Sequence, residues 1–117
     1  MEHVYTLKHI GINHPNADAA RETADRLNHI FNLPKGPDGD GPIFVGTIFE
    51  CLKNDLRGAH GHLAVAVDDV EWAIQDLASR GVEFLEEPIL RDENGRIKFI
   101  LLKESVAGFV IHLSKAD

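Results

Sequence analysis

Cysteine is almost absent from this chain of 117 residues, which contains only Cys51. A single cysteine excludes a disulfide within the chain and agrees with a reducing compartment. The sequence has no apolar run long enough to span a membrane, and it does not begin like a signal peptide. We therefore expect a cytoplasmic protein that has no membrane partner.

Basic residues are also few, because 12 Lys and Arg stand against 19 Asp and Glu and give a net charge of -7. Nucleic acids and anionic membranes bind basic patches, and the sequence shows no evident patch of this kind. The hydrophobic content of 44% is enough for a real core, and we expect one domain over residues 1–117. A small molecule is the ligand that this composition favours.

Two segments of the chain resemble each other, 7–12 (Leu-Lys-His-Ile-Gly-Ile) and 60–67 (His-Gly-His-Leu-Ala-Val-Ala-Val), and a helix-like pattern follows each. The chain is interpreted as one module written twice, with module one at residues 1–55 and module two at residues 60–117. Each module is predicted to contain a strand, a helix and then up to three antiparallel strands. This order predicts an α+β domain with two helices outside a curved, mostly antiparallel sheet.

Module one is predicted to begin with a strand over residues 4–13, followed by a helix that starts at 15–18 (Pro-Asn-Ala-Asp). The Pro- and Gly-rich stretch that follows this helix cannot extend it and is expected to be an exposed loop, with a stunted edge strand near Lys35. Two further strands are predicted on either side of a bend at Gly46. They cover residues 43–45 and 47–53.

Module two has clearer signals at the ends of its elements. Asp68 and Glu71 have the spacing of a capping box, which predicts a helix opened by Asp68. Gly81 is predicted to end this helix in the left-handed conformation, and Asn94-Gly95 is the strongest two-residue hairpin signal in the chain. The strands of this module are predicted at residues 62–67, 82–90, 96–103 and 109–114.

One polar residue interrupts each of four apolar strands. His9 and His62 lie in the first strands of the two modules, and Glu50 and His112 lie in the last strands. Because side chains alternate between the faces of a strand, all four point to the inner face if helices cover the outer one. A buried polar group needs a partner. We predict that the four bind one divalent ion, for which Zn, Ni, Mn, Co and Fe are all suitable.

The remaining histidines are interpreted differently. His3, His14 and His29 lie near the terminus, at a helix start and on a polar helix face, and we expect them at the surface. His60 shares a strand face with His62 but lies at the frayed start of the strand. We expect it at the rim of a pocket or beside the ligands.

Three cations are candidates for holding a substrate carboxylate, although residues of these types are more often solvated charges. They are Lys8, Arg57 and Arg96.

Segments 8–12 and 61–65, with the final strand 108–113 (Gly-Phe-Val-Ile-His-Leu), resemble the vicinal oxygen chelate superfamily. That superfamily includes glyoxalase I, extradiol dioxygenases and bleomycin-binding proteins. The resemblance spans nearly the whole chain and implies paired βαβββ modules that form a cupped, mostly antiparallel sheet with helices outside. It also implies metal ligands at His9, Glu50, His62 and His112, of which His112 stands where the superfamily commonly has glutamate.

The resemblance implies a metal-dependent enzyme, a lyase or isomerase that acts on a small oxo- or hydroxy-acid able to chelate the ion. Glu50, the only carboxylate among the predicted ligands, is predicted to be catalytic by moving a proton, with His112 as a weaker candidate. Two alternatives stay open, an Fe(II) dioxygenase of the extradiol type and a metal-free small-molecule binding protein. The small size of one cup favours a homodimer, in which the modules pair either within one chain or between two.

Overall fold

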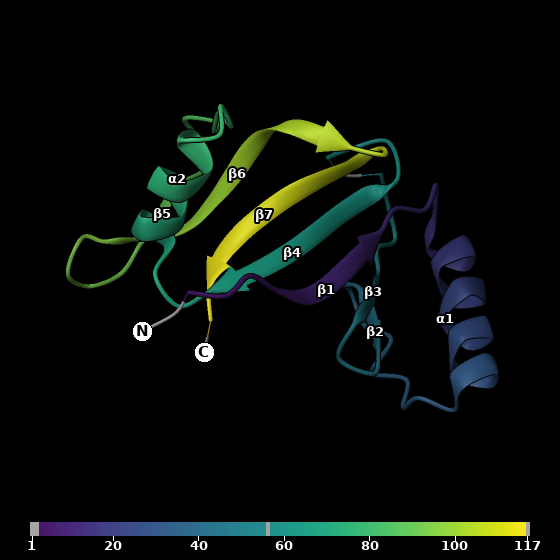
Figure 1. Cartoon of the computed structure of the whole chain (residues 1–117). Coiled ribbons are helices and arrows are strands. Elements are labelled where there is room, and N and C mark those ends of the chain that lie inside the picture. The colour runs from purple at the N-terminus through teal and green to yellow at the C-terminus, as the bar shows by residue number, and fades with distance from the viewer. Residues whose placement is uncertain (1–2, 56, 117) are drawn as a thin grey trace.

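The computed structural model describes residues 3–55 and 57–116 and shows one mixed sheet with a helix against each end (Figure 1). In the described residues the strand order is β2-β3-β1-β4-β7-β6-β5, and four of the six neighbouring pairs are antiparallel. This confirms the predicted α+β class with a mostly antiparallel sheet. The elements are β1 (Thr6–Ile12), α1 (Ala17–Phe31), β2 (Ile43–Val45), β3 (Phe49–Cys51), β4 (Gly61–Val67), α2 (Val70–Ala78), β5 (Leu90–Arg91), β6 (Ile97–Val106) and β7 (Phe109–Lys115).

The two halves of the chain meet at the antiparallel pair of β1 and β4 in the middle of the sheet. β1 also pairs with β3 in parallel, and β4 pairs in the same way with β7. Each half therefore places its last strand beside its first strand. This arrangement is consistent with paired βαβββ modules, and it brings the four interrupted strands side by side.

The first half has its own small core beneath α1. The helix begins at Asn16, whose side chain accepts a hydrogen bond from Ala19 N at 2.8 Å. It ends at Asn32, whose φ of 55° is left-handed. Small residues on the inner side of α1 let it lie close against β2 and β3. The core residues are Ala20, Ala24, Ile43, Val45 and Cys51.

The N-cap of the second helix, α2, lies one residue later in the sequence than predicted. Asp69 is the N-cap and accepts a hydrogen bond from Trp72 N at 3.1 Å, whereas Asp68 contacts His3. Glu71 does not complete a capping box, because its carboxylate accepts a hydrogen bond from Ile97 N on β6. The capping-box prediction was wrong because the Glu71 side chain binds the backbone N–H of Ile97, which lies far away in the sequence. Beneath α2 the core consists of Val67, Val70, Ala73, Ile100, Leu102 and Leu113.

The strand predicted over residues 82–90 is much shorter than expected. Only an isolated bridge from Phe84 to Leu102 and the two-residue β5 are formed, and Pro88 lies between them without an N–H group to donate to a ladder. Similarly, in the first half, Lys35 forms a single bridge to Val45. Asn94 and Gly95 lie at a hairpin tip as predicted, where Asp92 N donates to Arg96 O at 2.8 Å around the loop.

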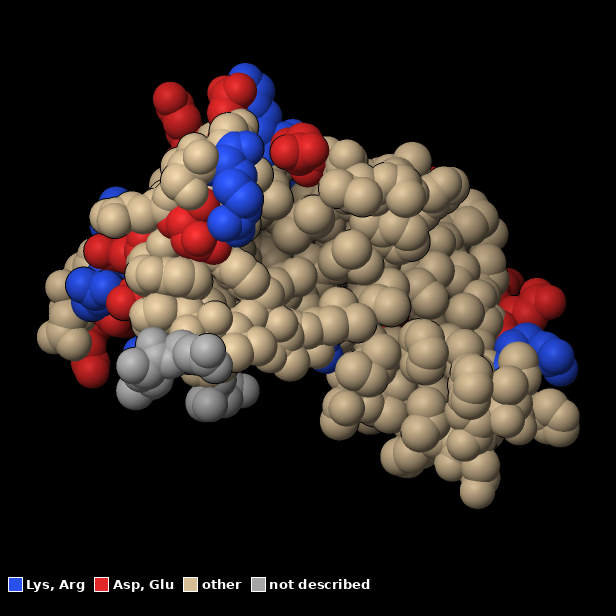
Figure 2. Space-filling model, in the orientation of Figure 1, with Lys and Arg blue, Asp and Glu red and all other residues tan. Residues whose placement is uncertain are grey.

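The chain is elongated, with principal extents of 41 × 27 × 26 Å. In Figure 2 the charged side chains gather over the end that holds α2 and β5 and at the opposite edge, and the broad centre of this face is uncharged. Neither described helix is long and apolar enough to cross a membrane.

Candidate metal centre

The register of the sheet brings the four predicted ligands into two adjacent rows on one face. Glu50 lies beside Gly11, which lies opposite His62. In the next row, His9 lies opposite Ala64, and Ala64 lies beside His112. Residues paired across neighbouring strands point to the same face, and so do residues two apart in one strand. All four side chains therefore lie on the face opposite the two helices.

His9, Glu50 and His62 converge at the centre of this face. Nε2 of His62 lies 3.0 Å from Oε1 of Glu50, and Nε2 of His9 lies 3.4 Å from the same oxygen. The two Nε2 atoms are 3.3 Å apart. Two ligand atoms that bind one ion at about 2.0–2.2 Å lie roughly 3.0–3.4 Å from each other at octahedral or tetrahedral angles. The three spacings agree with this range, so the cluster could bind a metal ion.

A buried oxygen in this cluster supports the fit. Oε1 of Glu50 is buried and, among the described residues, accepts no hydrogen bond. An unsatisfied buried acceptor costs about 1–3 kcal/mol, and more for a charged group. A divalent cation would satisfy this carboxylate oxygen and the lone pairs of both imidazoles together.

The structure places His112 differently from the other three. Its ring stacks on the ring of His62, with centroids 4.2 Å apart and planes only 2° from parallel. An imidazole binds a metal in its ring plane, so two parallel rings cannot bind the same ion. In this arrangement His112 lies outside the set of three donors, and it would join them only after its ring turns.

The environment of the site favours the protonation states that metal binding requires. Burial, together with the rings of His62 and His9, lowers the pKa of His112 to about 4. Burial also lowers the pKa of His9, against the opposing effect of Glu50. The contact with His62 lowers the pKa of the Glu50 carboxyl, against the opposing effect of burial. At neutral pH, His9 and His112 are therefore neutral and Glu50 is ionised.

Aromatic rings flank the predicted ligands on both sides. Phe44 on β2 approaches His9 edge-on at 5.9 Å, and Phe99 on β6 approaches His112 edge-on at 5.3 Å. Sequence reasoning did not identify either residue as part of the site. The alternation within their strands was visible, but the pairing of Phe44 with Glu50 and of β6 with β7 depends on the register of the sheet.

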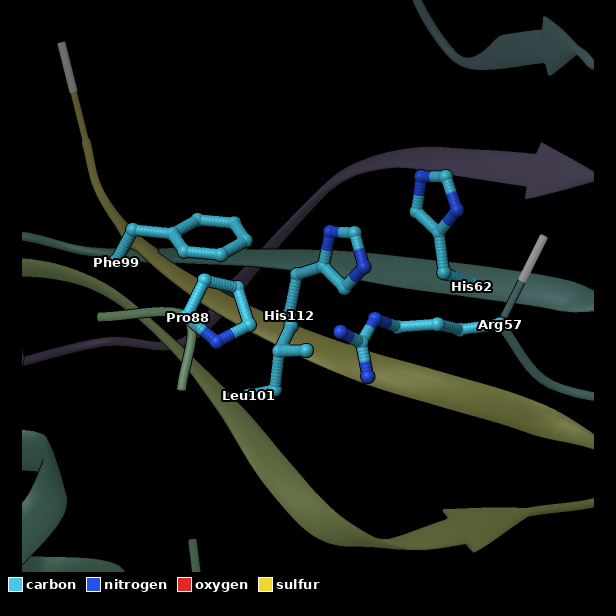
Figure 3. A pocket seen from close by; sticks show the side chains of 6 residues that line it. All are labelled: Arg57, His62, Pro88, Phe99, Leu101 and His112. Carbon is cyan, nitrogen blue, oxygen red and sulfur yellow. The ribbon is translucent and has the colours of Figure 1, made fainter. Parts of the chain in front are cut away.

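A cavity of about 540 Å³ opens beside His62 and His112 (Figure 3). Its apolar wall comes from β6 and from the segment before β5. Arg57, from the link between the two halves, is the cation at its border. The lining residues are Arg57, His62, Pro88, Phe99, Leu101 and His112.

The other histidines have structural or surface positions. His29 is exposed, as predicted. The surface prediction for His14 was wrong: its side chain is buried, with Nδ1 2.7 Å from Leu52 O and Nε2 2.8 Å from Thr23 Oγ1. His3 is half-buried and stacks on Trp72, and His60 is exposed with its ring beside Phe109.

The sequence matches the model of the Glyoxalase/Bleomycin resistance protein/Dioxygenase superfamily over residues 7–112. Among solved structures, the chain is similar to a hypothetical protein from Bacillus halodurans, with a TM-score of 0.62 and 17% identity over 97% of this chain and 95% of that chain. This likeness shows a shared fold. A comparison with curated proteins gives no match.

Proposed function

This chain belongs to the Glyoxalase/Bleomycin resistance protein/Dioxygenase superfamily, and we propose that it is a metal-dependent enzyme for a small oxo- or hydroxy-acid. The reaction class that we propose is enolisation or isomerisation, or the related lyase chemistry. The observation that carries this proposal is the convergence of His9, Glu50 and His62 beside a cavity that can receive a substrate.

The proposed ligands are His9, Glu50, His62 and His112, of which the structure brings the first three together. Imidazole and carboxylate donors suit Zn, Ni, Mn, Co and Fe. When bound there, such an ion supplies Lewis-acid stabilisation for negative charge on two adjacent substrate oxygens.

Within this proposal, Glu50 is the catalytic residue that accepts and returns the proton. Its carboxyl is ionised at neutral pH. Oε1, which would bind the ion, makes no other hydrogen bond among the described residues, so the carboxylate would leave the ion to accept the proton. His112 is a second candidate, because its neutral ring borders the cavity. Phe99 and Leu101 line the cavity with apolar surface and would exclude water from the reacting groups.

An Fe(II) dioxygenase is the second candidate function. Two histidines and one carboxylate with open positions are the ligand set of many non-haem Fe(II) oxygenases. The observation that supports this alternative is the stacking of His112 on His62, which leaves three converging donors. A requirement for Fe(II) and loss of turnover without oxygen would distinguish this function from enolisation.

Metal content tests the proposal directly. Protein purified without a histidine tag should contain about one divalent ion per chain by elemental analysis. His62→Ala and Glu50→Ala should each lower that content while the domain stays folded, and His29→Ala, at an exposed position, should not. Wild-type protein that binds none of the five metals would exclude both enzymatic functions and support a metal-free binding protein.

We also propose that the protein forms a homodimer through the outer face of β1 and β4. A compact monomer of 13.0 kDa has an accessible surface of roughly 6,300 Å². The accessible surface of this chain is 7315 Å², which is larger by about 1,000 Å². A standard interface covers about 800 Å² on each partner. The helices pack at the ends of the sheet, on β2 and β3 and on β6 and β7. Between them Leu7, Ile10 and Leu63 form an apolar strip that a second copy would cover.

A further inference from the structure

The cavity beside the metal centre is divided into an apolar part and a polar part. Pro88, Phe99 and Leu101 form the apolar wall, and the rings of His62 and His112 form its floor (Figure 3). Its volume of about 540 Å³ lies within the range of roughly 300–1,000 Å³ for pockets that hold drug-sized ligands. A three-carbon acid would leave most of this space empty.

Arg57 borders the cavity because the link between the two halves is held against the sheet. Nδ2 of Asn13 donates to Gly58 O at 3.1 Å and to Arg57 O at 3.4 Å. Gly58 has a φ of 82°, and a Cβ there would lie 2.5 Å from Gly61 O. The backbone at Arg57 is thereby held close to the start of β4, and the side chain extends along the cavity beside His112 (Figure 3).

The charge of Arg57 has no carboxylate partner within ion-pair distance in residues 3–55 and 57–116. The other two candidate cations have different positions. Arg96 pairs with Asp69 at 3.0 Å on the side of the molecule that holds α2, and Lys8 does not line the cavity. Arg57 is thus the one cation that both borders the cavity and is available to a ligand in the described part of the chain. A guanidinium binds a carboxylate through two parallel hydrogen bonds.

We propose that the substrate of this site is a carboxylic acid with a bulky apolar body. Its carboxylate pairs with Arg57, and its body packs on Phe99 and Leu101. This inference rests on the proposed function, since it names the substrate class of the same site. It also makes Arg57 and Phe99 determinants of specificity: the first selects for the acid, and the second selects for the apolar body.

Three probes separate the two parts of this recognition. The compound 3-phenylpropanoate carries both the carboxylate and an apolar body, 3-phenylpropan-1-ol lacks the charge, and acetate lacks the body. Isothermal titration calorimetry should be carried out with each probe on protein freed of metal by a chelator and again on protein loaded with Zn²⁺. In both forms, 3-phenylpropanoate should bind at least about 10-fold more tightly than either of the other probes.

Substitutions at Arg57 and Phe99 test whether these two residues produce the preference for 3-phenylpropanoate. Arg57→Gln should weaken 3-phenylpropanoate by about 10- to 100-fold, the value of a charge-assisted hydrogen-bonded pair, and should leave 3-phenylpropan-1-ol unchanged. Phe99→Ala should weaken both phenyl probes. Arg96→Gln is the matched control, because it removes the same charge from the other side of the molecule and should bind all three probes as the wild type does.

Equal binding of 3-phenylpropanoate by Arg57→Gln and wild type would overturn the inference, as would failure of the wild type to bind it in either form. Equal weakening by Arg96→Gln would show that net charge, and not Arg57, is responsible. Metal content is measured separately on each variant. A wild type with one bound ion but no selectivity for this probe would overturn only the substrate class, whereas a wild type that binds the probe and no metal would overturn only the proposed enzyme.

Discussion

Gly11 on β1 lies directly opposite His62 on β4, and the His62 ring occupies the space that a side chain on Gly11 would need. A Cβ at Gly11 would lie 2.1 Å from Cε1 of His62. Gly11 lies between His62 on β4 and Glu50 on β3. The His62 ring thus extends over a residue without a side chain, and this allows it to reach Glu50.

Gly11→Ala should therefore disturb the metal centre without changing any ligand. The added methyl group forces the His62 ring away from Glu50, and we expect metal affinity to fall by about 10- to 100-fold, as when groups that orient ligands are removed. Unfolding free energy should fall by about 1–3 kcal/mol from overpacking. Metal titration and thermal unfolding measure the two effects. Gly41→Ala is the control, because a Cβ there meets no atom within 4 Å. Unchanged metal affinity in Gly11→Ala would show that the ring of His62 does not need this space.

Much of the site could be predicted because strand alternation is a local property. Glu50 follows Phe49 and precedes Cys51, so its face is fixed once the helix is known to cover the other one. The convergence of His9 with His62 required only that two similar strands meet as neighbours. The stacking of His112 on His62 depends on side-chain rotation, which the sequence pattern does not determine.

The errors have a different cause, which is competition between local and distant partners. Asp68 and Asp69 are both suitable caps, and the local pattern does not separate them, because the Glu71 carboxylate binds Ile97 N on the distant strand β6. His14 follows a predicted strand, where a surface position is common. Its partners are Thr23 on α1 and Leu52, the residue after β3, and only the folded chain brings them together.

His14 should contribute to stability and not to metal binding. Leu52 O can only accept, so Nδ1 of His14 carries the proton and Nε2 accepts from the Thr23 hydroxyl. His14→Ala removes both hydrogen bonds and leaves a buried gap, and we expect a loss of about 2–4 kcal/mol in the free energy of unfolding. Chemical denaturation measures this loss. His29→Ala, at an exposed position, should change the value by less than about 0.5 kcal/mol. Metal content should stay at the wild-type level in both variants, and a loss of metal in His14→Ala alone would contradict this assignment.

The Tyr5–Asp76 hydrogen bond should give the protein a stability term that depends on pH. Burial and the neighbouring Asp76 raise the pKa of Tyr5 to about 12, and the contacts with Arg80 and Tyr5 lower the pKa of Asp76. Since the pKa of Tyr5 in the folded protein exceeds its unfolded value, its contribution is complete below pH 10 and is lost as the pH rises to about 12. The contribution of Asp76 is present above its ordinary pKa and is lost as the pH falls below it.

Tyr5 is the only tyrosine of the chain, so the ultraviolet absorbance of tyrosinate reports its titration directly. Asp76→Asn should move the midpoint from about 12 back toward 10, because it removes the negative charge beside the hydroxyl. Glu83→Gln removes a negative charge from a side chain that contacts Lys103, and it should leave the midpoint in place. A wild-type midpoint at the ordinary value for tyrosine would show that the hydrogen bond of 2.6 Å does not persist in solution.

The proposed dimer can be tested by placing a charge on the outer face of the central strands. Leu7 is 44% exposed and lies on that face, opposite Val65, so Leu7→Glu should leave each chain folded and separate the copies. Val106→Glu is the control, because Val106 is similarly exposed at 48% but lies at the turn between β6 and β7. In sedimentation at micromolar concentration, the wild type and Val106→Glu should have about twice the mass of the 13.0 kDa chain, and Leu7→Glu should have the mass of one chain. A wild type that sediments only as a monomer would contradict the dimer. A dimer that persists in Leu7→Glu would exclude this face, because a buried unpaired carboxylate at the interface costs several kcal/mol.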